Sequence, residues 1–278
     1  MVLRPLALLL SVSLASPAFA ADLRDETKQA FTHYAAVVQA RFDSQLKEGQ
    51  PFLWIDSLHN DSRQKAILNR LHSGEVVTER LQEKENGKVI DVPSGLVHHW
   101  IGTVFIPGVR LNQVLAILED YDHHKLVYKP DVVDSRLISH NGNDFKAYLR
   151  FYKKKIIGIT LNTEHDAHYV TLSPTRAYST SHSTRIAEVE DAGKADEREK
   201  PVGHDNGFLW ALDSFWRLEE KDSGVYVQCE AITLTRDIPA MFAWLVKPFV
   251  TDVPKESLFT TLNATRVGLQ QGAHRSGN

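Results

Sequence analysis

The chain has 278 residues, and its 32 lysines and arginines against 35 aspartates and glutamates give a formal net charge of −3. This near-neutral balance excludes the strongly basic surface that is typical of nucleic-acid-binding proteins. The single cysteine, Cys229, excludes an intramolecular disulfide, so the hydrophobic core alone must hold the fold.

The first twenty residues, MVLRPLALLLSVSLASPAFA, predict a secretory signal peptide. Arg4 precedes an apolar run, and small residues at Ala18 and Ala20 form an A-x-A cleavage pattern before Ala21. A membrane anchor would need about 20 apolar residues in a row, and serine and proline break this run too early. We therefore expect a periplasmic or secreted protein whose mature chain begins at Ala21.

Helical periodicity predicts two helices at the start of the mature chain, over residues 23–48 and 61–73. Gly49 and Pro51 end the first helix, and Gly74 ends the second. The apolar face of the first helix consists of Phe31, Tyr34, Val38 and Phe42.

Two further elements follow a strand that runs into an Asn-Gly turn near residue 86. LVHHWIGTVFI (96–106) is rich in β-branched and aromatic residues and predicts a strand. RLNQVLAILEDY (110–121) carries its leucines and valine on one helical face and predicts a helix. The pair His98–His99 therefore lies on a strand, and the pair His123–His124 lies in the loop after a helix.

The rest of the chain is dominated by strands and closes with a helix. Five strands are expected between 132 and 189, followed by a charged exposed loop over 190–206. The remaining elements are two strands at 208–220 and 225–237, an apolar segment at 238–250 and a helix at 254–270. Segregated strands and helices indicate the α+β class with an antiparallel sheet.

The last hairpin permits a prediction of its register. If residues 221–224 form the loop without a bulge, Glu220 pairs with Val225 and Trp216 pairs with Cys229. One side of the hairpin is then apolar, and it comprises Ser214, Trp216, Leu218, Val227, Cys229 and Ala231. The other side is expected to be charged and wet, and it comprises Arg217, Glu219, Gln228 and Glu230.

Several stretches resemble the START-like superfamily, also called SRPBCC. The resemblance lies in DYDHHKLVYKPDVVDSRLI (120–138), with its D-Y start and its P-x-V-x-x-S continuation. HHWIGTVFIPG, RIAEVEDAG, GFLWALDSFWRLEE and QCEAITLTRDIP are more narrowly similar to an exported bacterial subgroup with no assigned activity. The resemblance covers residues 75–270.

The resemblance implies a helix-grip fold, in which a curved antiparallel sheet wraps around a long C-terminal helix. Residues 21–74 would then be an extra N-terminal helical extension, and residues 271–278 a disordered tail. It also implies a cavity between the concave sheet face and the C-terminal helix, which superfamily members use for lipids, sterols or other apolar molecules. Fold alone does not fix a function.

The apolar hairpin face supplies the first candidate cavity residues, and Trp210 shares its parity if the strand is unbroken. These candidates are Trp210, Trp216, Leu218, Val227, Cys229 and Ala231. Small residues on the strand 177–187 leave room for a ligand, and Arg185 on the same face would meet an anionic head group. Alternatively, Arg185 forms a strand-end ion pair with Glu188 or Glu190. Tyr148 and Arg150 are further candidates, although they alternate with Ala147 and Leu149 and either set can face inward.

The apolar segment 238–250 is too short to span a bilayer. It is a candidate lid over the cavity or a peripheral membrane contact, and a core segment under the last helix is an equal alternative. The lid residues would be Met241, Phe242, Trp244 and Leu245.

No metal or cofactor is expected. His98 and His99 are neighbours on a strand and point to opposite faces, and the same holds for His165 and His168 at their offset of three. HExxH and Cys-rich clusters are missing from the sequence, as is a Gly-x-Ser-x-Gly elbow. Cys229 fits a buried small hydrophobe better than a nucleophile.

These observations together favour a non-enzymatic exported protein that binds or carries a hydrophobic or amphipathic small molecule. Two alternatives stay open: a cyclase- or hydrolase-like enzyme that uses the same cavity, and a structural protein whose core is filled by its own side chains.

Overall fold

The computed structural model describes residues 21–155, 157–237 and 252–276. The first part of the chain contains β1 (Ala21–Asp22), α1 (Asp25–Gln45), the 3-10 turn η1 (Trp54–Ser57), α2 (Asp61–His72), β2 (Val77–Arg80), β3 (Lys84–Glu85) and β4 (Lys88–Val89). Then follow β5 (Gly95–Pro107), α3 (Leu111–Glu119), α4 (His124–Val127), β6 (Val132–Asn141), β7 (Asp144–Lys154), β8 (Gly158–Ser173) and β9 (Arg176–Glu190). The chain continues with β10 (Arg198–Glu199), β11 (His204–Asp205), β12 (Ala211–Lys221), β13 (Gly224–Arg236) and α6 (Val253–Ser276).

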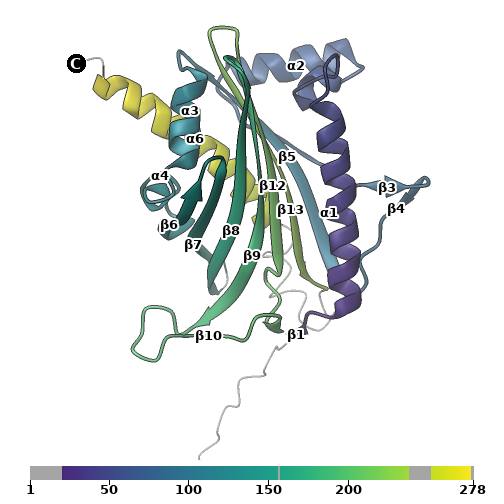
Figure 1. Cartoon of the computed structure of the whole chain (residues 1–278), viewed down its shortest axis with the longest axis vertical. Coiled ribbons are helices and arrows are strands. Elements are labelled where there is room, and N and C mark those ends of the chain that lie inside the picture. The colour runs from purple at the N-terminus through teal and green to yellow at the C-terminus, as the bar shows by residue number, and fades with distance from the viewer. Residues whose placement is uncertain (1–20, 156, 238–251, 277–278) are drawn as a thin grey trace, which may run out of the picture.

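One antiparallel sheet dominates the structure (Figure 1). Its strands are ordered β2-β5-β13-β12-β9-β8-β7-β6, and the short β10 pairs with β9. Where five strands were expected between 132 and 189, the described residues form four, β6 to β9, because β8 runs without interruption through the position of two of them. The predicted loop 190–206 contains the two-residue strands β10 and β11. The sheet and the long α6 against it confirm the predicted α+β helix-grip fold.

The sheet has two covered faces. We call the side that carries Trp216 and Cys229 the cavity face, and the side that carries Arg217 and Glu230 the N-terminal face. Helix α6 lies on the cavity face and α1 on the N-terminal face (Figure 1). On the cavity face, a Cβ atom at Gly102 of β5 would lie 2.6 Å from Cδ1 of Leu262, so glycine lets α6 approach the sheet closely.

The N-terminal face is buried, which makes the predicted wet surface wrong. The apolar stripe of α1 packs on Phe215, Ile232 and Leu234, and η1 and α2 cover Phe105 and Tyr226. The four side chains that were expected in water, Arg217, Glu219, Gln228 and Glu230, are at most 5% exposed. Alternation along the strands gave the correct set of residues but not the helices that cover them.

The predicted register of the last hairpin is confirmed. Trp216 pairs with Cys229 and Glu220 pairs with Val225. Pairing extends one step further than predicted, to Lys221 and Gly224, so the turn contains only Asp222 and Ser223. Both have positive φ, 55° and 60°, as expected for a tight turn that matches the twist of a hairpin.

Ser223→Gly is expected to raise the free energy of unfolding by about 1 kcal/mol, because glycine removes the steric cost of a left-handed backbone. Denaturant unfolding of the two proteins measures the difference. Ser139→Gly is the control, since Ser139 is an exposed residue within β6 and glycine there should weaken the strand. A loss of stability in both variants would contradict the prediction.

Candidate functional site: a cavity between the sheet and the C-terminal helix

A cavity of about 270 Å³ lies between the cavity face and α6, and its far end is closed by α3 and α4. The sheet side is formed by β7, β8, β9, β12 and β13 and by the start of β6. Its apolar lining from the sheet includes Leu149, Phe151, Ile159, Leu161, Leu212, Trp216, Cys229 and Ala231. The helices and the turns next to α4 contribute Leu118, Tyr121, His124, Tyr128, Val253, Pro254, Ser257, Leu258, Thr260 and Thr261.

Small side chains around Trp216 leave space for the cavity. Ser179 of β9 and Cys229 of β13 flank Trp216 in the two neighbouring strands. The indole Nε1 donates to Oγ of Ser214 over 3.3 Å, which fixes the position of the ring. Ser181 also lines the cavity, so the space next to it is open. Because its neighbours are small, the Trp216 ring forms one wall of the cavity and does not occupy the cavity itself.

Two charged residues belong to the described lining, Asp131 and Lys153, and they form an ion pair with each other. Burial lowers the pKa of both His124 and His165 to about 4 and raises the pKa of Tyr121 to about 12. These rings are consequently neutral at pH 7. The cavity thus has no net charge from its described residues and holds no ionised carboxylate without a cation.

Three predicted cavity residues, Trp216, Cys229 and Ala231, line the cavity. Burial raises the pKa of the Cys229 thiol, so it is a neutral hydrophobe there. Leu218 and Val227 share this face, as predicted, but they do not reach the cavity. They are packed in the core cluster that includes Leu111 and Val114 of α3.

Arg185 does not belong to the cavity, because β9 has a bulge. Glu164 pairs with Arg185 whereas the next residue, His165, pairs with Ser183, and the extra residue reverses which side chains face inward. Arg185 therefore points away from the cavity and forms an ion pair with Glu199 of β10. The alternative of a strand-end ion pair was right in kind, although the partner is neither Glu188 nor Glu190.

Trp210 also lies elsewhere. It precedes β12, so the alternation of that strand does not extend to it, and it packs against the α1 cluster. Its Nε1 donates to Oδ1 of Asp205 over 3.0 Å.

Tyr148 and Arg150 are on the outer side of β7. The Tyr148 hydroxyl donates to Oδ1 of Asn162, and the Arg150 guanidinium makes two 2.8 Å contacts with Glu197. The inward set contains Leu149, Phe151 and Lys153. The proposed lid residues Met241, Phe242, Trp244 and Leu245 lie outside the described residues.

The sequence interpretation missed the contribution of α3 and α4 to the cavity. Tyr121, His124 and Tyr128 come from the DYDHHKLVY stretch that carries the START-like resemblance. The Tyr169 hydroxyl donates to the carbonyl of Leu118, so in its 2.9 Å contact with Tyr121 it accepts the proton of the Tyr121 hydroxyl. The three residues do not share a helix, since α4 spans only His124–Val127 and Tyr121 lies in a turn before it, so helical periodicity gave no signal for them.

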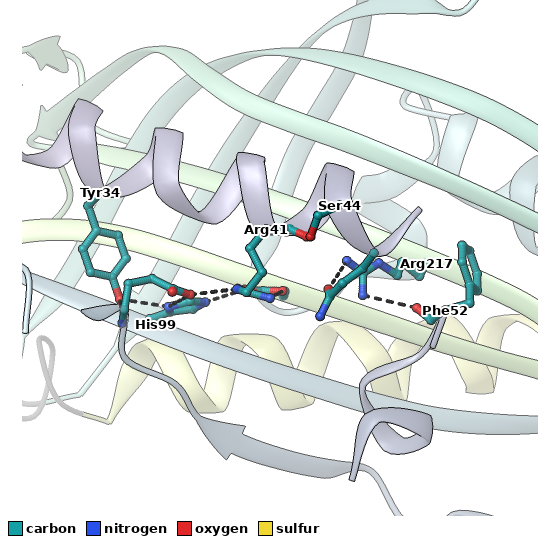
Figure 2. Close-up of polar contacts among 9 residues, drawn as sticks. Tyr34, Arg41, Ser44, Phe52, His99 and Arg217 are labelled. Carbon is teal, nitrogen blue, oxygen red and sulfur yellow. Dashed lines mark hydrogen bonds and ion pairs between the residues drawn. The ribbon is translucent and has the colours of Figure 1, made fainter. Parts of the chain in front are cut away.

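A second polar assembly is buried on the N-terminal face (Figure 2). The Tyr34 hydroxyl accepts from the Glu83 amide and lies 2.9 Å from Nδ1 of His99. Nε2 of His99 lies 2.6 Å from Oε1 of Glu230, and Arg41 pairs with the same carboxylate. If the tyrosine donates to Nδ1, His99 carries its proton on Nε2 and donates to Glu230.

Glu83, His99 and Glu230 place ligand atoms within 4.8 Å of one another, the one such three-residue set in the part of the chain that the structure describes. Arg41 pairs with both carboxylates, at 2.9 Å from Glu83. The guanidinium therefore occupies the position that a metal ion would need, and burial makes any further cation there costly.

No family model matches this sequence, and no curated protein matches it. Similar solved structures include a protein of Thermus thermophilus, at 12% identity and a TM-score of 0.46 over 62% of this chain and 97% of that one. A STAR-related lipid transfer protein from Xanthomonas axonopodis is 17% identical, with a TM-score of 0.42 over 69% and 98%. An aromatase/cyclase from a Streptomyces species is 12% identical, with a TM-score of 0.43 over 66% and 99%. The helix-grip assignment itself rests on the strand order and on α6.

Proposed function

We propose that this protein binds, and carries, a hydrophobic or amphipathic small molecule in the cavity between the sheet and α6. The observation that carries the proposal is a mainly apolar cavity of about 270 Å³ whose two charged lining residues pair with each other. Apolar cavities of about 150 Å³ already bind molecules such as benzene. The open volume argues against a core filled by the protein's own side chains.

The chemistry of the lining favours binding over catalysis. An acid–base enzyme needs a group whose pKa lies near the working pH. The lining histidines and Tyr121 have pKa values moved away from neutrality by burial, and Asp131 is paired with Lys153. The few hydroxyl groups at the wall, such as Ser181 and Thr233, are suited to hydrogen bonds with the polar end of an amphipathic ligand.

Trp216→Ala is expected to weaken binding of a fluorescent fatty-acid analogue at least tenfold, because the indole is a large part of the cavity wall. Fluorescence titration measures the affinity, and denaturant unfolding checks that the variant is folded. Trp210→Ala is the matched control, since it removes the same ring from the opposite face and should leave the affinity unchanged.

Organic extraction of the purified protein, followed by mass spectrometry, identifies any molecule that copurifies with it. Wild-type protein that binds no apolar probe and releases no apolar molecule would overturn the proposal and favour the filled-core alternative. Equal losses of affinity in the Trp216 and Trp210 variants would place the ligand elsewhere.

Export is part of the proposal, and it rests on the A-x-A pattern before Ala21. N-terminal sequencing of the protein from its native host should begin near Ala21, and an intact Met1 would contradict export. Among the described residues, no helix has the length and apolar character needed to cross a membrane. Exchange of the bound molecule with lipid vesicles would distinguish a carrier from a protein that only stores its ligand.

A further inference from the structure

A second cavity, of about 260 Å³, lies on the N-terminal face of the sheet. It is bounded by the end of α1, by η1 and by the connection between β2 and β3, none of which is part of the sheet-and-α6 grip. Its lining comprises Arg41, Gln45, Trp54, Leu81, Gln82, Glu83, Ile101 and Arg217. Gln82 is exposed and Trp54 is half-buried, so the cavity is accessible from solvent.

Arg217 is the unusual residue of this lining. It is 1% exposed and stacks over the ring of Phe42, at 4.4 Å from the centroid. Its guanidinium donates to the carbonyl oxygen of Phe52 over 3.2 Å and to Oε1 of Gln45 over 2.7 Å (Figure 2). Its Nε has no hydrogen-bond partner within the described chain, and Glu230 influences the pKa of Arg217 through space, without a direct ion pair among the described residues.

The neighbouring arginine is in a different situation. Arg41 lines the same cavity, but Glu83 and Glu230 both pair with it. Buried cations in proteins are normally paired, because an unpaired buried charge is costly. Burial lowers the pKa of Arg217 only to about 10, so the side chain remains a cation at pH 7. Arg41 takes both carboxylates, so Arg217 is the cation of this lining that no carboxylate of the described residues contacts directly.

We propose that the second cavity is a binding site for a small organic anion, whose carboxylate or phosphate pairs with Arg217. The planar guanidinium, with an unused N–H group, is suited to an oxyanion. Trp54, Leu81 and Ile101 supply apolar walls for the body of the ligand. This site is separated from the first cavity by the sheet, and the proposal does not depend on what the first cavity binds.

The test uses the full mature protein and follows the Nε–H signal of Arg217 by NMR, assigned through its loss in Arg217→Gln. Titration with benzoate, an anion with an apolar body, is expected to shift this signal saturably, with a Kd of about 1 mM or tighter. Benzyl alcohol, which has a similar shape without the charge, should have no effect. Inorganic phosphate in a parallel titration shows whether a phosphate head is accepted as well as a carboxylate.

Gln82→Trp provides a variant that leaves the buried arginine intact, because residue 82 is exposed and the new ring would fill the cavity mouth. Benzoate binding should fall at least tenfold in this variant and remain unchanged in Trp216→Ala, whose change is on the opposite face. The proposal is overturned if neither benzoate nor phosphate shifts the Arg217 signal at about 10 mM, or if Gln82→Trp binds benzoate as well as the wild type.

Discussion

Glu230→Ala is expected to lower the free energy of unfolding by about 3–5 kcal/mol, the range seen when one partner of a buried ion pair is removed. Glu230 is 1% exposed, and its carboxylate is shared by His99 and Arg41. Its removal leaves the buried His99 imidazole without its acceptor and Arg41 with Glu83 as its remaining carboxylate, and the helix α1 that supplies Arg41 and Tyr34 loses part of its attachment to the sheet. Denaturant unfolding with a common m-value measures the loss.

Glu197→Ala is the matched control for this experiment. Glu197 also contacts an arginine through two hydrogen bonds, those from Arg150, but the pair lies at the surface. Exposed ion pairs contribute little to stability, so this replacement should cost much less than Glu230→Ala. Losses of similar size in the two variants would mean that the Tyr34–His99–Glu230–Arg41 assembly does not hold α1 on the sheet.

His124→Gln is expected to become relatively more stable than the wild type as the pH falls. Burial lowers the pKa of His124 to about 4, and the carbonyl groups of Ile117 and Leu118 are its ring's partners at 3.2 and 3.1 Å. In the unfolded chain a histidine titrates near pH 6.5, so between these values only the unfolded state takes up the proton. The wild type therefore loses about 2.5 kcal/mol through this residue between pH 7 and about pH 4.5.

The difference between variant and wild type is the quantity to measure, by denaturant unfolding at each pH. Burial raises the pKa of Glu188 to about 7 and that of Asp213 to about 6. In the folded state these two carboxyls take up protons at a higher pH than they do in the unfolded chain, so they raise the free energy of unfolding as the pH falls. In the wild type this gain opposes the loss caused by His124. His123→Gln is the control, because it makes the same substitution at the adjacent ring, which is exposed. A constant difference for His124→Gln would show that this ring is not held neutral by the fold.

A feature could be predicted from the sequence where residues close together in the chain determine it, and could not where distant residues do. The register of β12 and β13 was predictable because a tight turn fixes it, and alternation then places Trp216 and Cys229 on one face. The bulge at Thr184 could not be read from the sequence, because no local residue signals it. One unpaired residue was enough to move Arg185 from the cavity to the surface.

The burial of the N-terminal face failed for a different reason. Polar side chains on a strand are normally exposed, and Arg217 and Glu230 are buried only because α1 brings Gln45 and Arg41 to them. The apolar stripe of α1 was the available clue, since an amphipathic helix needs an apolar surface to cover. Which surface it covers depends on contacts between residues far apart in the chain, and a single sequence does not specify them.

The position of β5 has a consequence for how the protein reaches its native state. This strand lies between β2 and β13 in the sheet, and its partner β13 is the last strand of the sheet in sequence: Gly102, for example, pairs with Cys229. The edge of β5 that faces β13 stays unpaired until almost all the other strands of the sheet have been synthesised. Pairings so distant in sequence close slowly, because the entropy of a large loop is lost before the contacts form. A chain that ends before β13 would retain a long apolar strand with an open edge, which makes truncated or stalled products prone to aggregation.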